Sequence, residues 1–193
     1  MVTHQNVTSF LRWALDHFSI SSCDRMSGHS DISFDLSVFD IFGSFFAGAT
    51  LCPVTHIGDK SFPGKFINDR EITIWFSVPS VIGTLRKSGQ LTQNIFSKHL
   101  RWAIFCGEAL LPDYAESWIK THPTVPMCNL YGPTEATIAC SYFNLGDERF
   151  IESGNAIPIG HPTADTEIQI LKQQTDEVAD VDEIGRLMIS GAQ

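Results

Sequence analysis

The sequence predicts an α/β fold with partly parallel sheets covered by helices, followed by a small β-rich C-terminal part. Short apolar runs alternate with helical patterns through most of the 193 residues, and such alternation implies parallel strand pairing with helices on both faces. Near residues 144–158 the pattern changes to short apolar runs joined by polar, acidic turns. We therefore expect an α/β core fragment at residues 1–145 and the start of a β-rich subdomain at residues 146–193.

Two helices are predicted in the first part of the chain. Apolar residues recur at helical spacing over 7–18, and Asn6 stands where a capping residue is expected. The apolar run over 38–46 predicts a second helix, with Asp35 and Ser37 as candidate caps. Because this run is apolar nearly all round, we expect its helix to be deeply buried.

The remaining elements are predicted from short runs rich in β-branched and aromatic residues and from prolines at helix starts. The predicted strands are 50–54, 72–76, 101–106 and 125–131, with short strands in the tail near Ile159, at 167–171 and at 185–189. The predicted helices between strands are 79–87 and 112–122, and a polar loop is expected at 19–33.

The composition excludes several classes of partner. The formal net charge is −9, which argues against nucleic acid or an anionic membrane, since both require clusters of Lys and Arg. Met1 is followed by polar residues, and no apolar run is long enough to span a bilayer. We therefore expect a cytoplasmic protein that binds neither nucleic acid nor membranes.

The cysteines and histidines give no sign of a metal site or a nucleophile. The five Cys are far apart with no C-x-x-C pair, so we expect reduced, buried thiols. The seven His form no metal-binding spacing, so surface or structural roles are expected. The sequence contains neither a G-x-S-x-G nucleophile motif nor a Walker phosphate loop.

The run from Tyr131 to Glu135 is the first candidate site. It follows an apolar strand and precedes a predicted helix, and open α/β sheets bind ligands beyond the carboxyl ends of their strands. The Gly132–Pro133 turn frees backbone to approach a ligand, while Thr134 and Glu135 offer a hydroxyl and a carboxylate. The alternative is a simple helix cap with an acidic first turn.

Two further places are candidates. Gly107 follows a strand end, where it either lets a flat ring lie against the backbone or serves only as a turn. Asp35 lies between Phe34 and Leu36, so its carboxylate must cap a helix, be paired, or receive a cationic group of a ligand. Capping and ligand binding both remain open for Asp35.

Taken together and in order, these places resemble the central motifs of adenylation domains, in the superfamily that includes nonribosomal peptide synthetases, acyl-CoA ligases and luciferases. One departure is Arg186, where the family usually has Glu. The resemblance covers nearly the whole chain and is carried by Phe34–Ser37, Gly107–Glu108, Asn129–Glu135, Ile157–Gly160 and Gly185–Gly191.

The resemblance implies ATP and Mg²⁺ as cofactors and a reaction in two steps. A carboxylate attacks the α-phosphorus of ATP to give an acyl-adenylate and pyrophosphate, and a thiol then takes the acyl group. By correspondence, the catalytic residues are Thr134, which contacts the α-phosphate, and Glu135, which holds Mg²⁺ in keeping with that ion's preference for oxygen ligands. The implied nucleotide-binding residues are Gly107, Glu108, Ala109, Asn129, Tyr131, Gly132 and Thr134.

The resemblance also implies an amino acid as the substrate. Asp35 is similar to the aspartate that receives the α-ammonium group in amino-acid-activating members. A buried carboxylate is costly unless a cationic group such as this ammonium is present. The residues implied to line the side-chain pocket are all apolar, which favours a compact apolar amino acid such as proline or alanine. They are Leu36, Phe39, Phe76, Ile104, Cys106, Leu130, Ile138 and Ala139.

Other parts of the family's machinery are expected outside these residues. The first six residues resemble the stretch after the family's Gly/Ser/Thr-rich phosphate loop, and the ribose-binding aspartate and the small domain with the catalytic lysine are expected downstream. We therefore expect no adenylation activity from this chain alone. An acyl-CoA or aryl-acid ligase fragment and a non-catalytic remnant of the fold stay open. So does the acceptor thiol, which is carrier-protein phosphopantetheine or coenzyme A.

Overall fold

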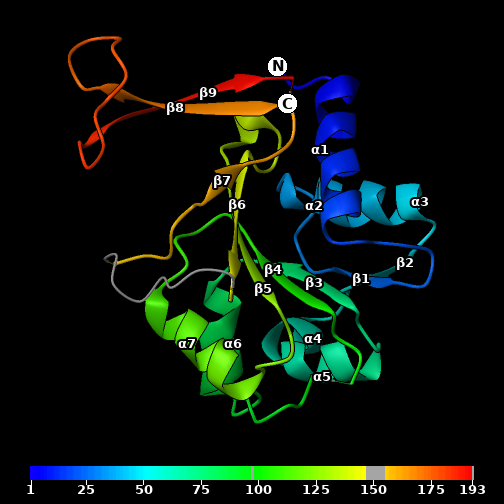
Figure 1. The fold of residues 1–193 in the computed structure, drawn as a ribbon. Helices are drawn as coiled ribbons and strands as arrows, with labels where there is room; N and C mark the ends of the chain where they lie inside the picture. The colour runs from blue at the N-terminus through cyan, green and yellow to red at the C-terminus, as the bar shows by residue number, and fades with distance from the viewer. Residues whose placement is uncertain (97, 147–154, 193) are drawn as a thin grey trace.

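The computed structural model describes residues 1–96, 98–146 and 155–192, which form two sheets and the helices around them (Figure 1). The larger sheet has seven strands in the order β2-β1-β3-β4-β5-β6-β7, and the smaller one pairs β8 with β9. The strands are β1 (Arg25–Gly28), β2 (Thr50–Pro53), β3 (Ile74–Ser77), β4 (Trp102–Phe105), β5 (Met127–Tyr131), β6 (Ser141–Leu145), β7 (His161–Pro162), β8 (Thr166–Lys172) and β9 (Gly185–Gly191).

Helices cover both faces of the large sheet and enclose two apolar clusters. One face carries α1, α2, a π-helical segment and α3, and the other carries α4 to α7 (Figure 1). Side chains of β3 and β4 alternate between the two clusters, which is why these strands read as continuous apolar runs. The helices are α1 (His4–His17), α2 (Leu36–Val38), the π-helix (Phe39–Gly43), α3 (Ser44–Ala47), α4 (Ile57–Ser61), α5 (Pro63–Asp69), α6 (Ser80–Lys87) and α7 (Pro112–Thr121).

The predicted α/β fold and its main elements are confirmed. Strands β1 to β5 are parallel, and β6 and β7 are added antiparallel. The first helix starts earlier than predicted, because Thr3 is its cap. Asn6 instead completes a capping box by accepting from the Thr3 backbone N–H at 2.7 Å.

The expectation of a loop throughout 19–33 is wrong, because β1 lies there between β2 and β3. Its polar residues are satisfied by neighbouring strands rather than by water. The Ser27 hydroxyl accepts from the Phe76 backbone N–H at 3.0 Å. The buried Asp24 accepts from Arg101 at 3.2 Å and from Thr73 at 2.7 Å. Because these contacts are polar, the segment has no run of apolar residues from which a strand could be predicted.

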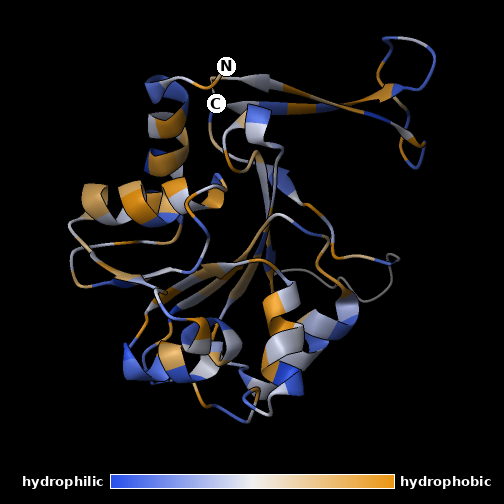
Figure 2. Cartoon of the chain, turned by 180° about the vertical axis from the view of Figure 1, so that it is seen from behind, coloured by the Kyte–Doolittle hydropathy of each residue, from blue (hydrophilic) through white to orange (hydrophobic). Residues whose placement is uncertain are grey.

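The prediction of a deeply buried second helix is wrong in part. The segment is broken into α2, the π-helix and α3, and only one side of it faces the core. Phe39 is fully buried, whereas Phe42, Phe45 and Phe46 are 47%, 66% and 58% exposed. In Figure 2 most of the ribbon of α3, at the left, has the colour of hydrophobic residues.

The tail forms a two-stranded antiparallel sheet close to the predicted strands, with Ile168 opposite Ile189. No strand starts at Ile159; instead β7 begins two residues later and joins the large sheet through β6. Part of the expected boundary, residues 147–154, lies outside the described residues. None of the helices in the described ranges has the length and hydropathy needed to cross a bilayer.

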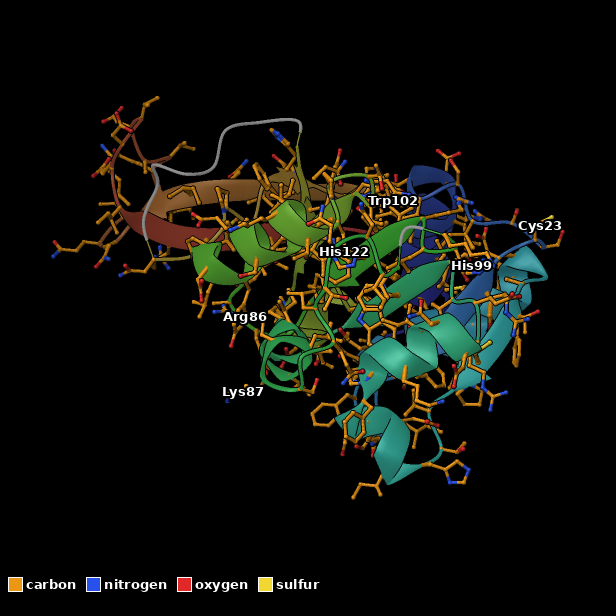
Figure 3. The ribbon with its side chains drawn as sticks, turned by 90° about the horizontal axis from the view of Figure 1, so that it is seen from below. Cys23, Arg86, Lys87, His99, Trp102 and His122 are labelled. Carbon is orange, nitrogen blue, oxygen red and sulfur yellow. The ribbon has the colours of Figure 1, made fainter. Side chains whose placement is uncertain are left out.

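The expectation of buried thiols is confirmed for four of the five cysteines and is wrong for Cys23. All five are free; Cys23 is exposed and the other four are buried. Figure 3 shows the labelled Cys23, His99 and His122 in separate parts of the molecule. Over the described residues, no group of three His, Cys, Asp or Glu side chains is arranged to hold a metal ion.

His122 generates a testable pH dependence. Its ring is fully buried and stacked on Phe96 at 4.7 Å, and burial lowers its pKa from 6.5 to about 4. Burial, with the charge of Lys60, lowers the pKa of His29 to about 4 as well. Because the unfolded chain binds more protons between pH 6.5 and 4, the free energy of unfolding falls as the pH drops through this window.

We predict that His122→Phe weakens this dependence, since the phenyl ring keeps the stacking and cannot be protonated. Urea unfolding at pH 7.5, 6 and 5 measures the effect. The Thr121 hydroxyl still donates to Ser117 in the variant, so no polar group is left unpaired. Equal slopes for the variant and the wild type would contradict the prediction.

Candidate functional site

The candidate site lies where the parallel strands end. The carboxyl ends of β1, β4 and β5 meet at one edge of the sheet, and they lead to Asp35, Gly107 and the turn after Tyr131. In Figure 1, α2 and the turn between β5 and β6 both lie above strands β3 and β4. This edge is where open α/β sheets bind ligands.

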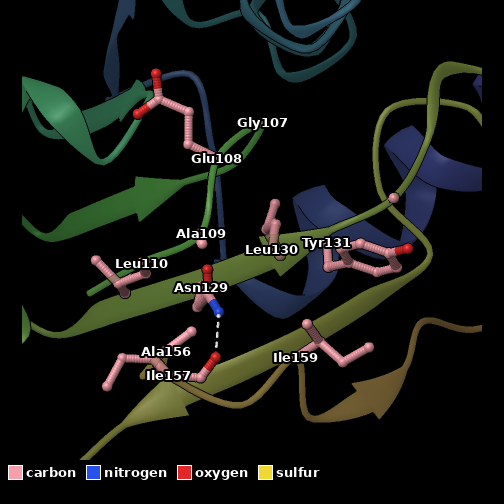
Figure 4. A pocket seen from close by; sticks show the side chains of 11 residues that line it. Gly107, Glu108, Ala109, Leu110, Asn129, Leu130, Tyr131, Ala156, Ile157 and Ile159 are labelled. Carbon is pink, nitrogen blue, oxygen red and sulfur yellow. Dashed lines mark hydrogen bonds between the residues drawn. The ribbon is translucent and has the colours of Figure 1, made fainter. Parts of the chain in front are cut away.

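A cavity of about 340 Å³ opens at this edge (Figure 4). Six of the seven predicted nucleotide-binding residues line it: Gly107, Glu108, Ala109, Asn129, Tyr131 and Gly132. The seventh, Thr134, is exposed on the adjoining turn. Ile157 and Ile159 supply apolar surface on the side opposite Gly107, so the cavity offers two walls for a flat ring.

Asn129 holds one wall of the cavity in place. Its side chain is 4% exposed, and its amide Nδ2 donates to the backbone carbonyls of Pro158 at 2.9 Å and Ile157 at 3.5 Å. The Ile157 backbone N–H also donates to the Leu110 carbonyl at 2.8 Å. Residues 157 and 158 are therefore fixed beside β5. Asn129 shapes the cavity by holding these wall residues in place.

Glu108 lines the cavity with its backbone, because its carboxylate is bound elsewhere. The carboxylate accepts from the Ser80 backbone N–H at 3.1 Å and from the Ser80 hydroxyl at 3.2 Å, at the start of α6. In Figure 4 it points away from Asn129. This is the arrangement expected of an acidic residue at a helix N-terminus. Gly107 has φ +90°, which explains why glycine is needed at the turn itself.

The expectation that a helix follows Glu135 is wrong. Thr134–Ala136 is a single 3-10 turn with no side-chain cap, and the chain then returns antiparallel as β6. The simple helix-cap alternative for Thr134 therefore fails. Both Thr134 and Glu135 are exposed.

The turn is closed by its own backbone and carries strain that the sequence did not signal. The Cys140 N–H donates to the Tyr131 carbonyl at 2.7 Å. Thr137 and Ile138 have φ of +57° and +70°, a conformation that is rare for β-branched residues and costs about 1–3 kcal/mol each. Backbone strain of this kind is often found at functional sites. It cannot be read from the sequence, because it depends on the folded conformation.

Glu135 is suited to a magnesium ion. Its exposed carboxylate lines a second cavity of about 280 Å³ together with Pro133 and residues of β9. Mg²⁺ is usually held in proteins by one or two carboxylates together with water and substrate phosphates. A single free carboxylate beside an open cavity fits that requirement.

Asp35 stands half-buried at the head of α2, and its side chain makes no capping hydrogen bond. All eight residues predicted to line the side-chain pocket belong to one apolar cluster on the α1 face of the sheet. Each of the eight is less than 8% exposed. These eight residues are therefore closely packed against one another, and the Asp35 carboxylate lies near one of them, Cys106.

Two buried titratable groups lie on this face of the sheet: Cys106, which is one of the eight residues, and Asp40, which follows Phe39 in the π-helix. The Cys106 thiol donates to the Ile138 carbonyl at 3.7 Å, and burial, with the nearby Asp35 carboxylate, raises its pKa to about 12. The thiol therefore stays protonated and forms part of the wall rather than acting as a nucleophile. Sequence analysis missed Asp40, whose pKa burial raises well above its ordinary value, an effect that the Ser30 and His29 backbone N–H groups oppose.

Comparison with known proteins identifies the family. The profile described as AMP-binding enzyme matches residues 1–193. The chain belongs to the AMP-binding enzyme family.

Its relatives within this family are ligases for amino acids. The L-proline–[L-prolyl-carrier protein] ligase of Streptomyces coelicolor is 31% identical over 193 residues, covering 98% of this chain and 36% of the ligase. The D-alanine–D-alanyl carrier protein ligase of Listeria monocytogenes is 30% identical over 197 residues, covering 99% of this chain and 38% of the ligase.

Solved structures of this family show the same fold. IdnL7 superposes with a TM-score of 0.89 at 31% identity, covering 99% of this chain and 38% of IdnL7. The Vibrio cholerae adenylation domain AlmE, in complex with glycyl-adenosine-5′-phosphate, gives a TM-score of 0.81 at 35% identity, covering 97% and 32%. The chain thus spans about a third of the length of these relatives, 32–38%.

Gly132 provides a test of the turn geometry. A Cβ at this position would lie 2.6 Å from the Ala139 Cα and 2.8 Å from the Cys140 backbone N. Since backbone atoms cannot rotate aside, we predict that Gly132→Ala lowers the free energy of unfolding by about 1–3 kcal/mol, the usual cost of overpacking. Urea denaturation measures this cost.

Gly58→Ala is the matched control, because nothing lies within 4 Å of its Cβ position and it sits in α4. We expect this variant to be neutral or slightly stabilised. Equal midpoints for the two variants would contradict the close approach of the turn to its own backbone.

Proposed function

We propose that this chain is the substrate-binding part of an ATP-dependent ligase that activates an amino acid as an aminoacyl-adenylate for transfer to a carrier-protein thiol. Asp35 supports this proposal most directly. Its carboxylate makes no capping hydrogen bond and directly precedes Leu36, the first of the residues proposed to line the side-chain pocket. An ammonium group is the partner that such a carboxylate requires.

The proposed roles follow the geometry of the site. The adenine ring lies between the backbone of 107–109 and Tyr131, against the wall that Asn129 holds. Thr134 contacts the α-phosphate from the exposed turn, and Glu135 holds Mg²⁺, which neutralises phosphate charge when it is bound. Residues 1–145 form the α/β core of the binding region, and residues 146–193 begin a β-rich subdomain.

The proposed substrate is a small apolar amino acid such as proline or D-alanine. Two observations support this choice. The residues proposed to line the pocket are nearly fully buried against one another, with Phe39 and Phe76 fully buried, which favours a small side chain over a long one. The relatives named above are ligases for proline and D-alanine.

Binding of non-hydrolysable adenylate analogues tests the role of Asp35. We predict that the chain binds alanyl-sulfamoyl-adenosine about 10- to 100-fold more tightly than the propionyl analogue, which lacks the ammonium group, because a charge-assisted pair contributes about 1.5–3 kcal/mol. Asp35→Asn should abolish the difference, as measured by calorimetry.

Asp16→Asn is the control, since it removes the same charge from an exposed position on α1. A wild-type chain that binds the propionyl analogue as tightly as the alanyl one would favour an acyl-CoA or aryl-acid ligase. A chain that binds neither would favour a non-catalytic remnant.

We further propose that these 193 residues alone do not catalyse adenylation. The sequence contains no Gly/Ser/Thr-rich phosphate loop, and the chain spans only 36–38% of the curated ligases it matches. We predict that ATP–pyrophosphate exchange with proline, D-alanine or glycine stays at background in the presence of Mg²⁺. Exchange that depends on the amino acid would contradict this.

A further inference from the structure

Three phenylalanine rings pack edge to face on the α1 side of the sheet. The ring centroids of Phe10 and Phe39 are 5.7 Å apart at an interplanar angle of 80°, and those of Phe39 and Phe76 are 5.1 Å apart at 88°. All three side chains are fully buried. Edge-to-face contacts at these distances are favourable and directional, so each ring constrains the tilt of the next.

The central ring, Phe39, is also held from its own helix. A Cβ on Gly43 would lie 3.2 Å from the Phe39 ring and 3.4 Å from the Met26 methyl group, so little space is left between this turn of the helix and the ring. Phe39 and Gly43 are the two ends of the π-helix, a distortion often found at functional sites. Contacts from α1, β3 and the π-helix therefore fix one orientation of the Phe39 ring.

We infer that Phe10 is a positioning residue that limits the size of the amino-acid side chain this chain accepts. The inference rests on the proposed function, in which Phe39 and Phe76 line the side-chain pocket. Phe10 comes from α1, an element that contributes none of the proposed pocket residues. It acts through Phe39, by preventing that ring from moving away from the substrate.

The consequence for specificity follows from packing. Interiors have few voids, so a buried ring moves only when a neighbour is reduced in size. A smaller residue at position 10 leaves space beside Phe39, into which the ring can shift, and the pocket gains the volume that the ring leaves. A single methylene in an apolar pocket changes discrimination by about 10- to 200-fold, so even a small shift alters the preference measurably.

The test compares the affinities of aminoacyl-sulfamoyl-adenosines with glycyl, alanyl, leucyl and phenylalanyl groups for the wild type and for Phe10→Leu. We expect the wild type to bind the alanyl analogue at least 10-fold more tightly than the leucyl one, and Phe10→Leu to reduce that ratio by about 10-fold or more. Phe10→Met, whose side chain has about the same volume as leucine but is unbranched, gives a second variant in which the ratio should also fall.

Phe18→Leu is the matched control. Phe18 follows the end of α1 in the same apolar cluster and is equally buried, but its ring contacts are with Trp13, His17 and Trp102. We expect Phe18→Leu to lower the free energy of unfolding without changing the ratio of the affinities for the alanyl and leucyl analogues. An unchanged ratio in both Phe10 variants with alanyl binding retained, or an equal change in Phe18→Leu, overturns the inference alone. Failure of the wild type to bind any analogue overturns the proposed function, and the inference falls with it.

Discussion

The parallel alignment of β1, β3, β4 and β5 is the constraint on which the rest of the structure depends. Parallel strands end at the same edge of a sheet, so residues that lie far apart in the sequence meet there. Cys106, after β4, donates to Ile138, after β5, and lies beside Asp35, which follows β1. The polar network of Asp24, Thr73 and Arg101 joins the opposite ends of these strands and so maintains the alignment.

The site consists of two parts with different physical character. The cavity that we propose for the nucleotide is open, and it is built from backbone and from the wall that Asn129 holds in place. The residues that we propose for the amino-acid pocket are rings and aliphatic side chains that belong to a buried apolar cluster. An open half suits a ligand recognised by its flat ring and phosphates. A closed half suits recognition of one small side chain by exclusion of larger ones.

The motif residues could be predicted from the sequence because their chemistry is local. The Tyr131–Glu135 run and Asp35 stand out as polar groups beside apolar runs, and the strand alternation gives the fold class. The sequence did not reveal β1, since Ser27 is satisfied by a neighbouring strand. Nor did it reveal the exposed face of α3, the strain at Ile138 or the contact of Phe10 with Phe39, because these depend on segments that meet only in the folded chain.

A crystal structure of the chain with alanyl-sulfamoyl-adenosine is the most direct measurement of the central claim, that nucleotide and amino acid meet in one site at the strand ends. We expect the adenine against the backbone of 107–109 and the ammonium group within hydrogen-bonding distance of the Asp35 carboxylate. A ligand whose adenine occupies the cavity while its ammonium group points away from Asp35 would contradict the account.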